Sequence, residues 1–227
     1  MVLIISVSKR KAQAISDIFY YMGVVSYAAA PSEALSEIST LYRAVLVLNP
    51  EELPDASGLA DKLRTYASSV PIFAISDFDT LSCGVFDARF PDSIYSSTLV
   101  GQIALYQRER NLPIIAQYRM AGIDASCDRE RVRVFDKPIS FTKTETMILR
   151  YLMVSYPMPQ SPKNIIKYAF KPSRKPEITS IRTHISIINK KFRDIQGRAL
   201  FVSIPKQGYT VSTPEILKTL EEENQLA

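Results

Sequence analysis

Three carboxylates follow an apolar run in the first half of the chain. Glu51, Glu52 and Asp55 come shortly after residues 44–48, which are Ala-Val-Leu-Val-Leu. Carboxylates that follow a buried strand in the sequence can accept a phosphoryl group or bind a hard cation such as Mg²⁺. Either chemistry needs further charged partners at the same edge of a sheet, so the surrounding elements decide whether this is a reaction centre.

The first half of the chain predicts alternating strands and helices. Short apolar runs at residues 2–5, 45–48 and 71–75 are typical of buried parallel strands. Helical spacing of apolar residues predicts helices over 12–22, 31–41, 59–66 and 99–106, while residues 80–95 have no clear pattern. This alternation indicates a right-handed α/β crossover fold, whose ligands gather at the carboxyl ends of the strands. Those ends fall at residues 6–8, 49–50 and 76–77.

These segments also have the order of a known domain. With Leu53, Pro54 and Gly58 in an L-P-x-x-x-G pattern after the middle strand, residues 1–110 resemble the receiver domain of bacterial response regulators. The resemblance implies an acidic pair after the first strand that binds Mg²⁺ and an aspartate after the third that accepts the phosphoryl group. It also implies a lysine after the fifth strand, which neutralises the charge of the phosphoryl group.

The metal-binding acids and the lysine are missing. No acidic residue precedes Asp17, so residues 6–8 offer no carboxylate to a metal ion. No lysine lies between Lys62 and Lys137. We therefore expect no metal site, no cofactor and no catalytic residue.

The phosphoacceptor is missing as well. Its position falls on Asn49, or on Pro50 if counted back from Pro54, and neither side chain can form an acyl phosphate. Only Ser76 matches the family, at its hydroxyl position. The sequence thus predicts a receiver-like domain that is not an enzyme and is not phosphorylated, with the three carboxylates in a solvated loop.

Charge differs between the two halves of the chain. The whole sequence has a net charge of +5, but residues 1–110 have 9 basic and 12 acidic side chains, whereas residues 111–214 have 18 and 7. A segment this basic indicates a polyanion as partner. No run of apolar residues reaches the roughly 18 that a membrane-spanning helix needs, so we expect no membrane partner. Cys83 and Cys127 have no metal-ligand spacing and are expected to be reduced thiols in the cytoplasm.

The basic segment contains the start signals of three helices and the pattern of a hairpin. Residues 142–145 form a capping box, and Ser161-Pro162 is a second helix start. A third helix follows Glu177, with an apolar stripe spaced 3 and 4 residues apart from Ile178 to Ile195. Apolar residues 200–204 and 209–211 predict a hairpin with a basic tip at 205–208.

The polar face of the third helix has residues suited to DNA. Arg and Asn can make paired contacts to base edges in a major groove while the apolar stripe packs on the domain. The polar residues are Thr179, Arg182, Thr183, His184, Ser186, Asn189, Lys190, Lys191 and Arg193.

The segment from Thr142 to Val211 resembles the winged helix-turn-helix domain of OmpR/PhoB-class response regulators. The motifs are F-T-x-T-E followed by I-L-x-x-L, T-H-I-S followed by K-K-F, and a closing Q-G-Y. The resemblance implies a recognition helix whose DNA contacts are Thr179, His184, Ser186, Ile187 and Asn189. On the wing, the resemblance implies that Ser203 and Lys206 contact DNA. We add Gln207 and Tyr209 to these predicted DNA-binding residues. The base preference of this recognition helix cannot be inferred from the family, because Ser186, Ile187 and Asn189 occupy positions where several arginines are usual.

The resemblance has two further implications. The loop at 171–176, with Lys171, Ser173, Arg174 and Lys175, falls where the family can meet RNA polymerase. The last helix of the receiver-like domain, with Leu99, Ile103 and Tyr106, falls where the family forms dimers.

We therefore predict a doubly wound, flavodoxin-like domain (1–110), a linker (111–118), an α+β winged-helix domain (119–214) and an acidic tail (215–227). The predicted function is a bacterial transcription regulator that binds double-stranded DNA as a homodimer on paired half-sites, independently of aspartyl phosphorylation. Three alternatives remain. They are a phosphorylated regulator with displaced chemistry at Glu51, Glu52 or Asp55, a ligand-gated regulator, and a protein-binding adaptor.

Overall fold

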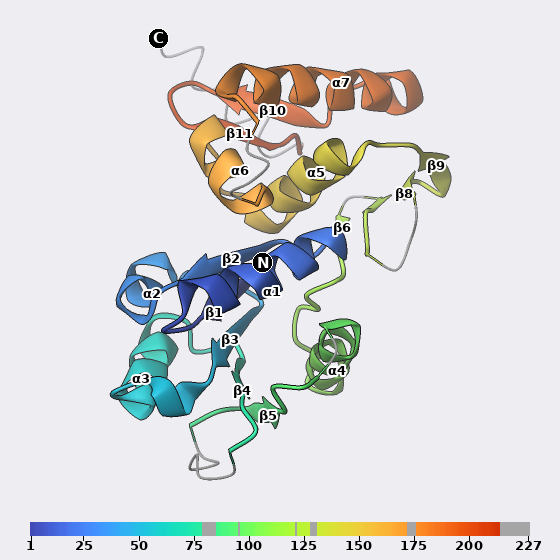
Figure 1. Cartoon of the computed structure of the whole chain (residues 1–227). Helices are drawn as coiled ribbons and strands as arrows, with labels where there is room; N and C mark the ends of the chain where they lie inside the picture. The colour runs from blue at the N-terminus through green and yellow to red at the C-terminus, as the bar shows by residue number, and fades with distance from the viewer. Residues whose placement is uncertain (79–84, 95, 121, 128–130, 172–175, 214–227) are drawn as a thin grey trace. The chain divides into compact units, whose positions relative to one another are not determined.

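The computed structural model describes residues 1–78, 85–94, 96–120, 122–127, 131–171 and 176–213. The chain forms two compact units, the first from Met1 to Gln117 and the second from Tyr118 onward (Figure 1). Each unit has its own sheet and its own helices. No helix in the described ranges is long and apolar enough to span a membrane.

The first unit is built on a parallel sheet. Its strands are β1 (Val2–Ile5), β2 (Ser26–Ala29), β3 (Ala44–Leu48), β4 (Ile72–Ile75) and β5 (Ala88–Phe90). They lie in the order β2-β1-β3-β4-β5, and every neighbouring pair is parallel. This order is the flavodoxin-like one, so the predicted doubly wound five-stranded sheet is confirmed. The residues of β1, β3 and β4 are all buried, as their continuous apolar runs indicated.

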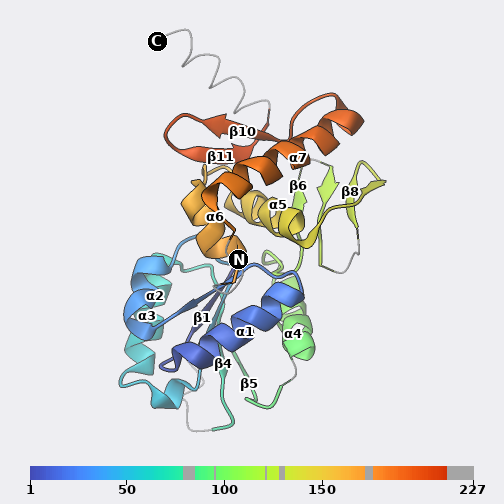
Figure 2. The same cartoon turned by 45° about the horizontal axis from the view of Figure 1, so that its top comes forward.

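Among the described residues of this unit, four α-helices flank the sheet, as Figure 2 lets the reader follow. They are α1 (Lys9–Tyr21), α2 (Pro31–Glu37), α3 (Ala56–Tyr66) and α4 (Ser96–Glu109). Helix α1 lies beside α4, and α2 lies beside α3. The expected extension of the second helix to Leu41 is wrong, because the backbone becomes extended at Ile38.

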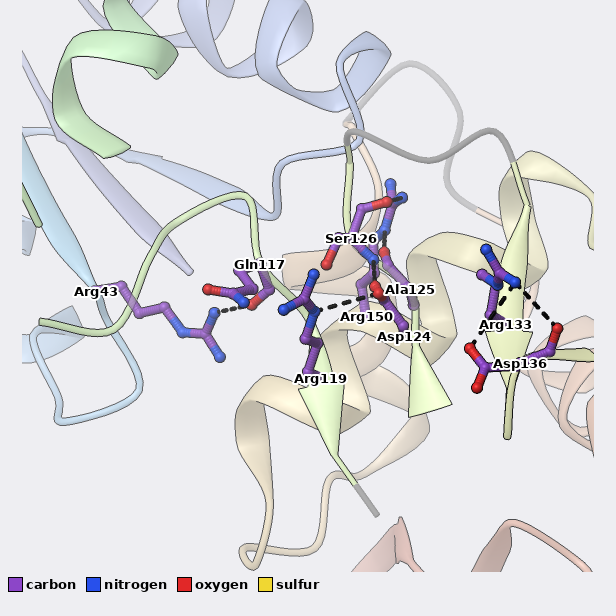
Figure 3. A network of polar contacts seen from close by, with 9 residues as sticks. All are labelled: Arg43, Gln117, Arg119, Asp124, Ala125, Ser126, Arg133, Asp136 and Arg150. Atoms are coloured by element: carbon purple, nitrogen blue, oxygen red, sulfur yellow. Dashed lines mark hydrogen bonds and ion pairs between the residues drawn. The ribbon is translucent and has the colours of Figure 1, made fainter. Parts of the chain in front are cut away.

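The segment after α4 packs back onto the first unit. Gln107 is fully buried, and its Nε2 donates to Arg43 O at 2.6 Å while its Oε1 accepts from Ile115 N at 2.9 Å. The Arg43 guanidinium donates to Ile114 O at 2.8 Å and to Gln117 O (Figure 3). These bonds hold the segment to the first unit as far as Gln117.

The second unit begins with a small antiparallel sheet. Its strands are β6 (Arg119–Met120), β7 (Ile123–Asp124), β8 (Val132–Val134) and β9 (Lys137–Ile139), paired in chain order. Gly122, with a φ of 81°, lies between β6 and β7. The β8–β9 turn lies at Phe135 and Asp136, which both have positive φ.

Three helices and a hairpin complete the described part of the second unit. They are α5 (Lys143–Ser155), α6 (Pro162–Ala169), α7 (Ile178–Gln196), β10 (Phe201–Ile204) and β11 (Gly208–Val211). The capping box at Thr142 and the Ser161 cap are confirmed. So is the predicted hairpin, and with it the α+β class of this unit.

A buried arginine ties α5 to the small sheet (Figure 3). Arg150 Nε donates to Ala125 O at 2.6 Å, and its Nη2 donates to Ser126 O at 3.1 Å. Its guanidinium also lies 5.4 Å from the ring centroid of the buried Tyr118. Charge-assisted hydrogen bonds of this kind are stronger than neutral ones, so Arg150 fixes the sheet against the helix that begins the three-helix core.

Candidate regulatory site and nucleic-acid interface

A network of four side chains lies at the carboxyl ends of the parallel strands. Asn49 follows β3 with a φ of 46° and is buried, and its Nδ2 donates to Glu51 Oε1 at 3.2 Å. Ser76 follows β4, and its hydroxyl donates to Glu51 Oε2 at 2.8 Å. Lys11 Nζ, from α1, donates to Asn49 Oδ1 at 3.1 Å. We call Lys11, Asn49, Glu51 and Ser76 the strand-end network.

The strand-end network favours the charged form of Glu51. Partial burial alone would raise the pKa of this carboxyl. Hydrogen bonds from the Glu51 backbone, Ser76 and Asn49, with the nearby charge of Lys11, outweigh that effect and lower the pKa below its usual value. Glu51 is therefore an anion bound to the hydroxyl of Ser76.

The other two carboxylates of the loop have ordinary structural positions. Asp55 is exposed and caps α3 by accepting from Gly58 N at 2.8 Å. Glu52 is exposed and lies 3.8 Å from Lys11 Nζ. The expectation of a solvated loop holds for these two and is wrong for Glu51, because Glu51 turns back onto Ser76 and Asn49.

Lys11 is the cation that the sequence reasoning missed. The family resemblance implies a lysine after the fifth strand, whereas Lys11 lies in the first turn of α1. A usable signal exists, because Ser8 is a residue type that caps helices and Lys9, Arg10 and Lys11 follow it. A helix that starts there places them at the carboxyl edge of the sheet.

The residues at this edge do not fit the Mg²⁺ that receiver domains bind. Ser6 is fully buried and its Oγ accepts from Ser8 N at 3.1 Å, and the side chain of Val7 offers no ligand atom. Glu51 already accepts hydrogen bonds on both carboxylate oxygens. Among the described residues, no three His, Cys, Asp or Glu side chains gather in a way that could hold a metal ion.

The outer face of α7 has most of the predicted DNA-contacting residues. Its inner face is buried through Ile181, Ile185, Ile188 and Phe192. The exposed residues are Thr179, Arg182, Thr183, Ser186, Ile187, Lys190, Arg193 and Asp194. Three of them are cations and one is an anion, so this face is positively charged and suited to phosphates and base edges.

Asn189 is not on that face, and its predicted DNA contact is wrong. The residue is buried, and its side-chain amide pairs with the backbone of β10. Nδ2 donates to Phe201 O at 2.9 Å, and Oδ1 accepts from Phe201 N at 2.8 Å. Both ends of the amide are bonded to β10 and the residue is buried, so Asn189 joins the helix to the hairpin and does not face outward to a base.

A partly buried ion pair joins α7 to the start of α5. Lys191 Nζ donates to Glu145 Oε2 at 2.6 Å and to Ser140 O at 3.0 Å. Burial alone would raise the pKa of Glu145, but the hydrogen bond from Lys191, the cap bond with Thr142 and the charge of Lys191 lower it. His184 lies half-buried on the same side of α7, and its buried Nδ1 has no hydrogen-bond partner among the described residues.

The hairpin presents its tip to solvent. Ser203, Lys206 and Gln207 are exposed, whereas Tyr209 is half-buried. Tyr209 pairs through its backbone with Gln160, at 2.8 and 2.9 Å. Gly208 has a φ of 123°, and a Cβ there would lie 2.2 Å from Gln160 O, so the Q-G-Y motif needs its glycine.

The predicted pairing residues are directed inward. Leu99 and Ile103 are buried in the first unit, so their assignment to a dimer surface is wrong. Tyr106 is half-buried, and its hydroxyl donates to Asp87 Oδ1 at 3.3 Å. Leu105 is the large apolar residue that α4 exposes.

Several predicted residues lie outside the described part of the chain. They are Ser173, Arg174 and Lys175 of the expected polymerase-contacting loop, Cys83, and the acidic tail at 215–227. Lys171, at the start of that loop, is half-buried.

Comparison with known proteins gives structural neighbours only. No family model matches the chain, and no curated protein matches it. A mutant of RitR is 18% identical with a TM-score of 0.40, covering 93% of this chain and 98% of its own. The response regulator DrrB of Thermotoga maritima, an OmpR/PhoB homologue, is 14% identical with a TM-score of 0.41 over the same shares. The DNA-binding domain of AdeR, solved in complex with an intercistronic region, is 17% identical with a TM-score of 0.37, covering 42% of this chain and 99% of its own. Likeness at this level assigns no function, so the proposal below rests on the chain's own residues.

Proposed function

We propose that the chain is a transcription regulator of the response-regulator type whose second unit binds double-stranded DNA. The observation on which this depends is the exposed face of α7, where Arg182, Lys190 and Arg193 accompany small polar residues. Lys206 adds a cation at the tip of the hairpin. Asn189 and Lys191 support the assignment, because they fix α7 to β10 and α5 and leave its outer face free to enter a major groove.

We propose further that this regulator works without aspartyl phosphorylation. The expected phosphoacceptor position falls on Asn49 or Pro50, and the carboxylate of Glu51 already accepts the Ser76 hydroxyl. In a receiver domain that hydroxyl would bind the incoming phosphoryl group. Because the Glu51 carboxylate is always bound to Ser76, this contact supports a first unit that stays in one conformation. Such a regulator acts in the cytoplasm, as a dimer on paired half-sites.

Salt dependence of duplex binding tests the first proposal. The purified full chain is expected to bind DNA with an affinity whose log–log salt slope is about −0.9 per phosphate neutralised. A genome-wide binding map of the same protein gives its preferred sites. An affinity for duplexes that does not change with salt would contradict DNA binding and favour a protein-binding adaptor.

Treatment with a small phosphodonor and Mg²⁺ tests the second proposal. We expect no acyl phosphate on a gel that retards phosphorylated proteins, and no change in DNA affinity. Three variants, Glu51→Gln, Glu52→Gln and Asp55→Asn, each remove one alternative acceptor of the loop. A retarded band that disappears in Glu51→Gln, Glu52→Gln or Asp55→Asn would show displaced phosphoryl chemistry and overturn the proposal.

A further inference from the structure

Ile187 is an apolar side chain on the polar face of α7. The other aliphatic residues in the middle of this helix, Ile181, Ile185 and Ile188, are at most 3% exposed, whereas Ile187 is 38% exposed. It follows Thr183 by four residues and precedes Lys190 by three, so these exposed side chains are its neighbours on the helix surface. Ile187 is thus placed among the groups that would face DNA.

The hydrogen-bonding groups near Ile187 are few. The amide of Asn189 is taken by Phe201, and Lys191 is bound to Glu145 and Ser140. Thr183 and Ser186 have short hydroxyl side chains, which hydrogen-bond to several bases with little discrimination. Arg182, Lys190 and Arg193 on the same face can contact guanine, but none of these groups recognises thymine by its methyl, which leaves that contact to an apolar side chain.

An exposed branched aliphatic side chain matches one feature of the major groove. Among the four bases of DNA, thymine alone presents an apolar group there, its C5 methyl. Contact with that methyl removes apolar surface of both partners from water, which favours binding. Neither the guanine edge nor the cytosine amino group gives such a contact.

We propose that Ile187 determines specificity by contacting the C5 methyl of a thymine, so that each half-site requires a thymine at one fixed position. This inference rests on the proposed DNA binding. It names the base feature that α7 recognises and the residue that recognises it.

Replacement of thymine by deoxyuridine isolates the methyl group. Preferred duplexes are first selected from a random pool with the full-length protein. Each thymine is then replaced singly by deoxyuridine, which keeps Watson–Crick pairing and removes only the methyl. We expect one position in each half-site at which this replacement weakens binding about fourfold, the worth of one buried methyl group.

Variants assign the effect to Ile187. In Ile187→Ala the ratio of the affinities for the thymine and deoxyuridine duplexes should fall from about four to about one, so that the variant does not discriminate between them. Its thermal unfolding should stay close to that of the parent because the residue is exposed. Ile178→Ala is the matched control, since Ile178 is 42% exposed at the start of the same helix but lies on its opposite side. It should keep the fourfold loss.

Two results would overturn the inference while leaving DNA binding intact. One is a parent protein that binds its selected duplexes but is indifferent to every deoxyuridine. The other is a methyl effect that persists unchanged in Ile187→Ala. Failure to select any duplex, together with affinity that does not depend on salt, would instead refute the proposed function on which the inference rests.

Discussion

Replacing Asn189 by alanine should destabilise the second unit and leave base preference unchanged. The variant removes both partners of Phe201, whose N–H and C=O are bonded to the side-chain amide at 2.8 and 2.9 Å. Phe201 is buried, so water does not easily replace the amide. A buried backbone group left without a partner costs about 1–3 kcal/mol, and two such groups give a loss of about 2–6 kcal/mol in the free energy of unfolding.

Urea unfolding and amide hydrogen exchange measure this loss in the full chain. The transition of the second unit should move to lower urea, and the Phe201 amide should exchange faster. Lys190→Ala is the control, because Lys190 is the exposed neighbour on α7 and its removal should change stability by less than about 0.5 kcal/mol. Unchanged stability and exchange in Asn189→Ala, with an altered order of preferred duplexes, would refute the assignment and restore Asn189 as a base-contacting residue.

Three further predictions concern other contacts. Lys191→Ala should lower the free energy of unfolding by about 1–3 kcal/mol at pH 7, because Glu145 stays buried without its cation. Since the folded pKa of Glu145 lies below its unfolded value of about 4.3, the parent protein has this stabilisation above that pH and loses it as the pH falls through the folded pKa. Urea titrations from pH 7 to pH 3 should therefore converge for parent and variant, and parallel curves would contradict the ion pair. Lys206→Ala should weaken all duplexes alike and reduce the salt slope by about 0.9, a result that sequence-dependent losses would contradict. Ile103→Ala should lower the free energy of unfolding by about 2–5 kcal/mol, because Ile103 is buried. Leu105→Ala should leave stability unchanged and weaken any dimer seen by sedimentation. The reverse pattern would assign the pairing surface to Ile103 again.

The elements that the sequence predicted are those set by local pattern. A capping box needs only Thr142 and Glu145, and the buried stripe of α7 needs only a repeat of 3 and 4 residues. Strand β2 was not predicted, because Ser26–Ala29 has no long apolar run and its residues are mostly half-buried. It is an edge strand that forms through pairing with β1, which local pattern does not encode.

The errors at the candidate sites have the same origin. Lys11 meets Asn49 across 38 positions of sequence, so no motif joins them. Asn189 was assigned by residue type, although it lies four residues after Ile185 and three before Phe192, within the buried stripe. Leu99 and Ile103 are likewise four residues apart, and the buried Gln107 continues their row. Helical spacing would have placed Asn189, Leu99 and Ile103 correctly, had it been given more weight than residue type.

The bond between Glu51 and Ser76 has a consequence for timing. A transferred phosphoryl group is lost by hydrolysis, so a phosphorylated regulator stays activated only for the lifetime of its acyl phosphate. The anion at Ser76 is instead part of the polypeptide, is present from the moment the chain folds and lasts as long as the chain. Under the proposed function no kinase or phosphatase can alter it, and the response should follow the synthesis and degradation of the protein, or the arrival of a partner.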